Sequence, residues 1–222
     1  MAITSTLRSR FTLNGLVFAL HRLRQRIGLA LATTTDWALF IGIVLIVGLG
    51  SSWYMVEHGT SLTTVTVGPW VSWTSAGRPD ADPYTRAHAA RLGILPLNAA
   101  VSQTFVARTD ADGRSLHSSC AYLVEGRESP GYWWSLAVFD SYGRMIPNTL
   151  DRFAFTSDTM AINPNGTYAV TLSRDANPGN WLPIGGAGKL ALVLTVIDLD
   201  TGGVSQEGEV EALAPTITRK GC

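Results

Sequence analysis

The chain contains few charged residues and few cysteines, and it lacks the short motifs that mark several enzyme classes. Charged residues make up 15% of its 222 residues, and there are two cysteines. His-Glu-x-x-His, Cys-x-x-Cys, Gly-x-Ser-x-Gly and phosphate-binding glycine loops are absent from the sequence. These absences argue against zinc peptidases, thiol-redox proteins, serine hydrolases of that type and nucleotide-binding proteins. We therefore predict no catalytic residues, no metal ligands and no cofactor.

The stretch Trp37–Val56 is strongly apolar and contains no charged residue. A helix of about 20 residues is about 30 Å long, enough to cross the hydrocarbon core of a bilayer. Trp37 lies at one end of the stretch, and Trp53 and Tyr54 lie at the other, where interfacial aromatic side chains are enriched. The sequence therefore predicts a single transmembrane helix over residues 37–56.

Positive charge is concentrated before this stretch. Five arginines precede it against one acid, and the three nearest are Arg22, Arg24 and Arg26. Because Lys and Arg mark the cytoplasmic side of a membrane, these arginines are predicted to determine the topology. Residues 1–36 would then be a cytoplasmic basic arm, and residues 57–222 an exported domain. A cleavable signal peptide is the alternative, but a signal core has only about 7–15 apolar residues and here the apolar run is longer.

The arm has apolar residues at helical spacing, with the arginines mostly off that stripe. Such a partly amphipathic basic helix either lies on an anionic lipid surface or packs on a neighbouring protein, and both remain open. Nucleic-acid binding is not predicted, because residues 57–222 carry sixteen acids against twelve bases. The apolar stripe consists of Leu13, Leu16, Val17, Leu20, Leu23, Ile27 and Leu31.

Both cysteines, Cys120 and Cys222, lie on the exported side of the predicted helix. An oxidising compartment permits a disulfide, and an even number of cysteines favours one. Such a bond would close a loop of about 100 residues and stabilise the domain by roughly 4–5 kcal/mol. The alternative is that Cys120 is a small buried residue and Cys222 a frayed terminal thiol.

After the apolar stretch, the sequence predicts many short strands and one short helix. Asp82 is a helix N-cap, Pro83 follows it in the first turn, and Gly93 ends the helix. The other segments are β-branched or alternating and are separated by turns that end in glycine. The predicted turns are Asp110–Gly113, Asp140–Gly143 and Asn163–Gly166. The predicted strands are Leu62–Val67, Gln103–Thr109, Cys120–Glu125, Tyr132–Phe139, Thr167–Ser173 and Lys189–Asp198.

The segment Lys189–Asp198 has apolar side chains at both sets of alternating positions. We predict that this strand is central in its sheet and covered on both faces. Short strands separated by turns, with little helix, predict a mainly β fold: an antiparallel, jelly-roll-like β-sandwich with one short helix. The two apolar sets are Leu190, Leu192, Leu194 and Val196, and Ala191, Val193 and Ile197.

Several segments resemble a bacterial family known as domain of unknown function 1214. Val67–Trp73 and Asp80–Arg91 are similar to its membrane-anchored members. The resemblance implies a jelly-roll-like sandwich and pairing with the related domain of unknown function 1254 in fused or neighbouring form. For a bacterial protein, the arginine bias then predicts an anchor in the inner membrane and a sandwich in the periplasm. The resemblance implies no established activity, and the long arginine-containing arm departs from the short N-termini expected. The segments that resemble the family itself are Tyr132–Arg144, Arg152–Phe155, Asn163–Tyr168 and Pro178–Pro183.

Aromatic residues are the best candidates for a ligand or partner surface. Two tryptophans lie between the first predicted strand and the helix, close in sequence to the membrane, and the others lie on the helix and on a later strand. The alternative is structural: a tryptophan here caps the sandwich, packs in its core or rests on lipid headgroups. The candidates are Trp70, Trp73, Tyr84, Arg86 and Trp133.

These observations predict a non-catalytic envelope accessory or binding module that is attached to the lipid bilayer and acts with a partner protein. Two alternatives remain open. A periplasmic enzyme acting on an envelope glycan would need convergent carboxylates or a histidine in a deep cleft. A small-ligand-binding domain would need an open mouth lined by aromatic side chains.

Overall fold

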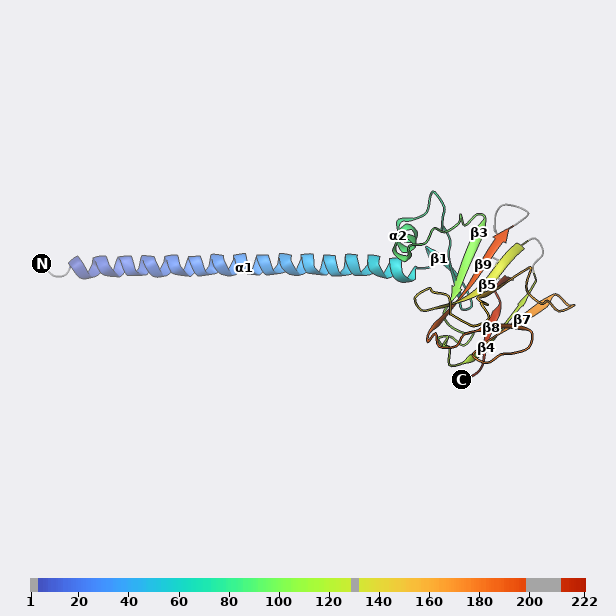
Figure 1. Ribbon diagram of the computed structural model, residues 1–222. Helices are drawn as coiled ribbons and strands as arrows, with labels where there is room; N and C mark the ends of the chain where they lie inside the picture. Colours follow the sequence, from blue (N-terminus) through green and yellow to red (C-terminus); the bar gives the residue numbers. More distant parts are fainter. Residues whose placement is uncertain (1–3, 129–131, 199–212) are drawn as a thin grey trace. The chain divides into compact units, whose positions relative to one another are not determined.

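The computed structural model describes residues 4–128, 132–198 and 213–222. The chain forms two compact units, Met1–Tyr54 and Met55–Cys222, and each is described by itself. The first unit is helical, and the second is rich in strands (Figure 1).

Helix α1 (Thr4–His58) contains both the arginine-rich arm and the apolar stretch without a break. Its segment His21–His58 contains an 18-residue window with a mean hydropathy of 2.1 and is long and apolar enough to cross a membrane. None of its apolar window is buried inside the protein, which suits a helix surrounded by lipid hydrocarbon. Arg22, Arg24 and Arg26 are exposed on this helix.

The strands of the second unit form two sheets (Figure 1). The larger has the order β1-β2-β3-β9-β5-β6, and the smaller has the order β10-β4-β7-β8. Among the described residues, the strands are β1 (Thr64–Val67), β2 (Trp70–Trp73), β3 (Ser102–Ala107), β4 (Ala121–Arg127), β5 (Tyr132–Asp140), β6 (Ala154–Thr156), β7 (Thr167–Ser173), β8 (Asn180–Pro183), β9 (Leu190–Asp198) and β10 (Thr216–Gly221).

The predicted mainly β sandwich is confirmed, with one correction to its strand directions. All named strand pairs are antiparallel except β7 and β8, which are parallel and pair Val170 with Asn180. Residues 174–179 carry the chain from the end of β7 back to the level of Val170 before β8 begins. The smaller sheet is therefore mixed rather than antiparallel throughout.

The core lies between the two sheets and is built from the inward positions of alternating strands. Leu136 of β5 and Leu194 of β9 face inward from the larger sheet, and Val124 and Leu172 face them from the smaller sheet, all at most 1% exposed. Trp134 and Tyr168 join the two sheets by stacking at a ring-centroid distance of 4.8 Å. Burial raises the pKa of the Tyr168 hydroxyl to about 12, so it remains neutral at physiological pH.

The strand register defines two ends of the larger sheet. At the end that we call the helix end, β1 begins after α1, β2 ends before helix α2 (Pro83–Leu92), and β3 begins after α2. At the opposite end, which we call the turn end, β3 and β5 run into the turns that begin at Asp110 and Asp140. The helix end holds the paired residues Ser102, Ile197 and Trp133, and the turn end holds Ala107, Leu192 and Val138.

Local sequence signals account for α2 and for the turns. The Asp82 side chain accepts hydrogen bonds from the backbone N–H groups of Tyr84 and Thr85, Pro83 occupies the first turn, and Gly93 ends the helix in the left-handed conformation. Each predicted turn has a glycine with positive φ, at 78°, 75° and 74°. These predictions are confirmed. The three glycines are Gly113, Gly143 and Gly166.

Strand β9 is central, as predicted, between β3 and β5 (Figure 1). Its inward side chains are buried, whereas the outward side chains of Val193 and Ile197 are only half-buried. We predicted that β9 is covered on both faces. In the described part of the chain, other residues bury its inner face fully but its outer face only in part.

Candidate functional site

Trp70 belongs to the core and not to the predicted surface. It is 1% exposed, and its indole N–H donates a hydrogen bond to the backbone oxygen of Pro215 at 2.8 Å. The reason lies in the register: Trp70 pairs with Ala107 of β3, and both side chains face inward. Trp70 thereby joins β2 to the segment that precedes β10.

Trp73 faces outward from β2 and meets α2. Its indole stacks on the His88 imidazole at a ring-centroid distance of 4.2 Å and an interplanar angle of 24°. His88 Nδ1 lies 2.8 Å from the backbone oxygen of Val56, and Arg91 forms an ion pair with Glu57. Val56 is the last residue of the predicted membrane span and Glu57 is the next residue, so α2 contacts the chain where that span ends.

Asp82 organises the start of α2 through hydrogen bonds. Its carboxylate accepts the Ser75 hydroxyl at 3.0 Å and the hydroxyl of Thr85, in addition to the two backbone N–H groups of the cap. Burial alone would raise the pKa of Asp82, but the hydrogen bonds from Thr85, Ser75 and Tyr84 outweigh it, so the pKa is lower than usual. Asp82 therefore remains ionised and acts as a structural cap.

The remaining surface candidates do not form one site. Arg86 is exposed on α2, where its guanidinium donates to the backbone oxygen of Pro79, and Tyr84 is half-buried on the same helix. Trp133 lies on β5, which β3 and β9 separate from β2, and its indole N–H donates to Asp158 at 3.0 Å. The structure thus brings Trp73, Tyr84 and Arg86 to the α2 region and leaves Trp133 apart from them.

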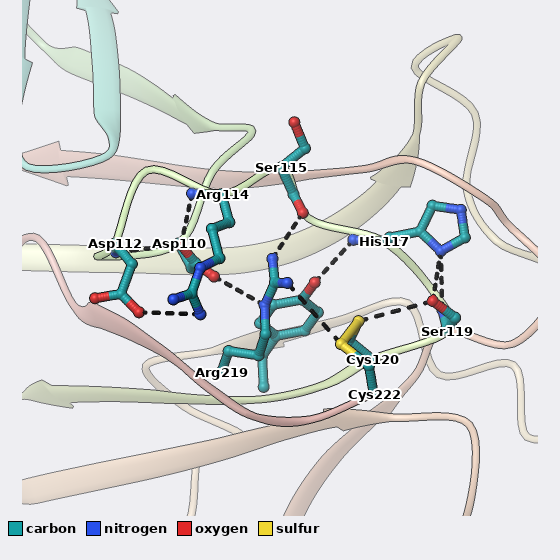
Figure 2. A network of polar contacts seen from close by, with 10 residues as sticks. Asp110, Asp112, Arg114, Ser115, His117, Ser119, Cys120, Arg219 and Cys222 are labelled. Carbon is teal, nitrogen blue, oxygen red and sulfur yellow. Dashed lines mark hydrogen bonds and ion pairs between the residues drawn. A yellow bond between two sulfur atoms is a disulfide. The ribbon is translucent and has the colours of Figure 1, made fainter.

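The two cysteines are paired at the turn end of the sandwich. The sulfur atoms of Cys120 and Cys222 lie 2.03 Å apart, so the cysteine pair is at disulfide distance, as predicted (Figure 2). Cys120 is buried directly before β4, and Cys222 directly follows β10. The bond therefore joins the outermost strand of the smaller sheet to the start of its neighbour.

A buried ion pair holds β10 at the same end. Arg219 Nε lies 2.9 Å from Asp110 Oδ2, and the Asp110 side chain is 1% exposed. These two atoms have no hydrogen-bond partner, so their contact is an ion pair without a well-aligned hydrogen bond. The Arg219 guanidinium also donates to the backbone oxygen of Ser115 at 3.0 Å (Figure 2). Its Cζ atom lies 5.5 Å from the centroid of the Tyr122 ring. These contacts hold the side chain of Arg219, which is the inward-facing charged residue among those described on β10.

His117 and Ser119 lie beside the disulfide and have the residue types of a nucleophile and base. The Ser119 hydroxyl is 2.8 Å from His117 Nδ1, and the Ser119 backbone N–H donates to the same nitrogen at 3.2 Å. Because His117 Nδ1 accepts the backbone N–H of Ser119, this contact closes a local turn. The side chains of His117 and Ser119 are both exposed. Nucleophilic catalysis also needs an oriented base and donors for the developing oxyanion. This pair is therefore better explained as turn structure than as a catalytic dyad.

In the part of the chain that the structure describes, no group of three or more His, Cys, Asp or Glu side chains could hold a metal ion. The absence of cofactors and catalytic residues remains a prediction from the sequence.

Sequence reasoning missed the residues that pair over long sequence distances. His88 has no local motif, and its stacking on Trp73 follows only from the packing of α2 against β2. Arg219 and Asp110 are far apart in the chain, so no spacing rule connects them. The sequence Asp-x-x-Gly-Arg occurs at both Asp110 and Asp140 and marks them as turn residues, but it does not indicate which of them pairs with a distant arginine.

Two packed sheets, a cysteine pair and a preceding apolar helix define a β-sandwich protein with a candidate membrane anchor. Residues 101–199 match the model of the family described as a protein of unknown function, DUF1214. The predicted resemblance to this family is confirmed over these residues. No curated protein matches the chain.

Two solved structures are similar to the chain. The VPA0106 protein from Vibrio parahaemolyticus has a TM-score of 0.54 at 18% identity, over 78% of this chain and 42% of that chain. An uncharacterized protein from Burkholderia cenocepacia has a TM-score of 0.33 at 16% identity, over 55% of this chain and 29% of that chain. The first similarity shows the fold alone. The present chain spans less than half the length of the Vibrio protein.

Proposed function

We propose that this protein is a single-pass envelope protein whose β-sandwich is a non-catalytic module for binding a partner protein. The observation that carries the proposal is a continuous apolar row on the outer face of the larger sheet. The register aligns one outward residue from each of five neighbouring strands. The row consists of Val71, Val106, Val193, Ala137 and Ala154.

The smaller sheet provides the comparison. Its outward positions alternate polar and apolar residues in the usual way for a face in water: Thr216, Glu125 and Ala169 form one row. On the larger sheet the adjacent outward row consists of Thr104, Thr195, Ser135 and Thr156, so the apolar row is one stripe on a mixed face. Because four members of the apolar row are only half-buried by the described residues, a partner protein that covers this face accounts for its composition.

Two independent features support export of the sandwich. The arginine bias favours a cytoplasmic N-terminus, and the cysteine pair at disulfide distance suits an oxidising compartment such as the periplasm. Both lead to the same orientation, with the sandwich outside the bacterial inner membrane.

Orientation is tested by the redox state of the cysteines in cells that are acid-quenched and then alkylated. We expect no alkylation of Cys120 or Cys222 in normal cells, and alkylation of both in cells that lack the periplasmic thiol oxidase. A variant combining Arg22→Glu, Arg24→Glu and Arg26→Glu should increase the alkylated fraction, because it removes the charge that retains the arm. Free thiols in normal cells would contradict the proposed orientation.

Partner binding is tested by affinity purification of the tagged full chain from mildly solubilised native membranes, followed by quantitative mass spectrometry. We expect a stoichiometric partner that is lost in Val193→Lys and retained in Thr171→Lys. Both positions are half-buried, outward-facing strand residues, but they lie on different sheets. Equal recovery with both variants would exclude the apolar row as the binding surface, and a chain without any partner would contradict the proposed function. A partner of the domain of unknown function 1254 type would agree with the resemblance.

A further inference from the structure

An exposed apolar segment follows helix α2 and has no role in the features described so far. It runs over residues 92–97, Leu-Gly-Ile-Leu-Pro-Leu, and we call it the leucine segment. Leu92, Ile94, Leu95 and Leu97 are 55%, 48%, 99% and 62% exposed. Four large apolar side chains exposed within six residues are unusual for a surface in water, and such a patch marks an interaction site.

The leucine segment is held in place by the folded unit. The Ile94 N–H donates to the backbone oxygen of Ala89, and the Ala99 N–H donates to Ala76. The backbone oxygen of Leu97 lies so close to Gly77 that a Cβ at Gly77 would be 2.3 Å from it. The side chains are therefore presented to the exterior by a fixed backbone.

The segment lies at the helix end of the larger sheet, where the chain leaves the apolar stretch. Helix α2, from which it continues, contacts Val56 and Glu57 through His88 and Arg91. Leu62, which is 85% exposed, follows Val56 by six residues, so it is within roughly 20 Å of it along the chain. The cysteine pair and the Asp110 turn lie at the opposite end.

We propose that the leucine segment and Leu62 insert into the interfacial region of the bilayer that holds the anchor. This inference rests on the proposed membrane attachment. We infer a lipid surface as the partner of this segment from the connectivity of the chain. Helix α2 contacts Val56 and Glu57, where the apolar stretch ends, so this end of the sandwich is the one attached to the predicted anchor. Apolar side chains on an interfacial element bury themselves among headgroups and upper acyl chains, which removes their exposed area from water.

The test is photolabelling of the full chain in phospholipid nanodiscs that contain a lipid with a diazirine close to its headgroup. Labelled residues are mapped by mass spectrometry. We expect labelling of residues 92–97 about tenfold above that of the exposed apolar side chains Tyr142, Met145 and Leu150, which follow the turn end of β5. Leu95→Asp should remove most of the labelling at 92–97, whereas the matched variant Leu150→Asp should leave it unchanged.

The outcomes separate this inference from the proposed anchor. Labelling of Trp37–Val56 without labelling of residues 92–97 would overturn the inference and leave the anchor intact. Absence of labelling in both segments would contradict the anchor itself. In cells, p-benzoylphenylalanine at position 95 should crosslink to phospholipid; a crosslink to a protein instead would show that the leucine segment is a protein-binding surface. Retention of the cysteine pair on a non-reducing gel verifies that each variant has folded.

Discussion

Two aspartates with the same local sequence have different surroundings. Asp110 and Asp140 both begin Asp-x-x-Gly-Arg turns, and each carboxylate accepts the backbone N–H groups two and four residues later. The second oxygen of Asp140 pairs with Arg144 of its own turn at the surface. Backbone hydrogen bonds from Arg144 and Tyr142, with the Arg144 side chain, lower the pKa of Asp140. The second oxygen of Asp110 is buried and pairs with Arg219.

This difference predicts unequal costs for the same substitution. Asp110→Asn removes the charge opposite the largely buried Arg219, and we expect a loss of about 3 kcal/mol in the free energy of unfolding. Asp140→Asn retains the turn, and its partner Arg144 has a side chain that is 73% exposed to water, so we expect a much smaller change. Urea unfolding of the full chain in detergent measures both. Equal midpoints for the two variants would show that the Asp110–Arg219 pair does not stabilise the sandwich.

A single glycine limits the packing between β4 and β7. A Cβ at Gly126 would lie 2.4 Å from the ring carbon Cζ of Tyr168, which is buried against Trp134. Gly126→Ala should therefore destabilise the protein by about 1–3 kcal/mol through overpacking. Gly221→Ala is the control in the same sheet, because nothing lies within 4 Å of its added Cβ. Measured under the same conditions, the thermal midpoint of Gly126→Ala should be lower than that of Gly221→Ala.

At the scale of elements, α2 depends on one carboxylate. Asp82→Ala removes the N-cap and should reduce stability by about 1 kcal/mol, whereas Asp82→Asn should retain most of it. Hydrogen exchange of the α2 amides measures the effect at the helix itself. Faster exchange in the alanine variant alone would support a capping role, and unchanged exchange would contradict it.

The same group gives α2 a pH dependence. The pKa of Asp82 is lower in the folded chain than its ordinary value of 3.8. The stabilisation from its hydrogen bonds is therefore complete above the unfolded pKa and is lost as pH falls through the folded pKa. We expect the protection factors of the α2 amides, taken relative to intrinsic exchange at each pH, to fall on acidification below about pH 4, and to fall less in Asp82→Asn. An acid response of the same size in both would assign it to another group.

Elements with a complete local signal were predictable, and those defined by distant contacts were not. Asp82, Pro83 and Gly93 give the bounds of α2, and glycine gives the turns, because capping and positive φ are properties of neighbouring residues. Strand β9 was predictable as central from its double apolar pattern. Strand β10 was missed because Thr216–Gly221 has little alternation: Arg219 faces inward and is satisfied only by Asp110 and its other polar contacts at the turn end. Trp70 was assigned to a surface because its burial depends on pairing with β3.

At the scale of the molecule, the cysteine pair stabilises the connection of β10. Cys120 and Cys222 are separated by 102 residues in sequence. Reduction should lower the free energy of unfolding by about 4–5 kcal/mol, since the unfolded chain regains the freedom of a long loop. Urea unfolding with and without reductant measures this, with a Cys120→Ala and Cys222→Ser double variant as the control that no longer responds. An unchanged midpoint on reduction would indicate that the pairing of β10 with β4 and the contacts of Arg219 retain β10 without the disulfide.

The position of β9 in the chain has a consequence for biosynthesis. The strands β1, β2 and β3 can pair in order as they are made, and so can β5 and β6, but in the described sheet β9 lies between these two groups and joins them. The larger sheet therefore remains divided until residue 198 has been synthesised, with the edges of β3 and β5 open to wrong partners in the meantime. Under the proposed export of the sandwich, assembly of this sheet is a late event, and holding chaperones on the far side of the membrane would protect its two halves until then.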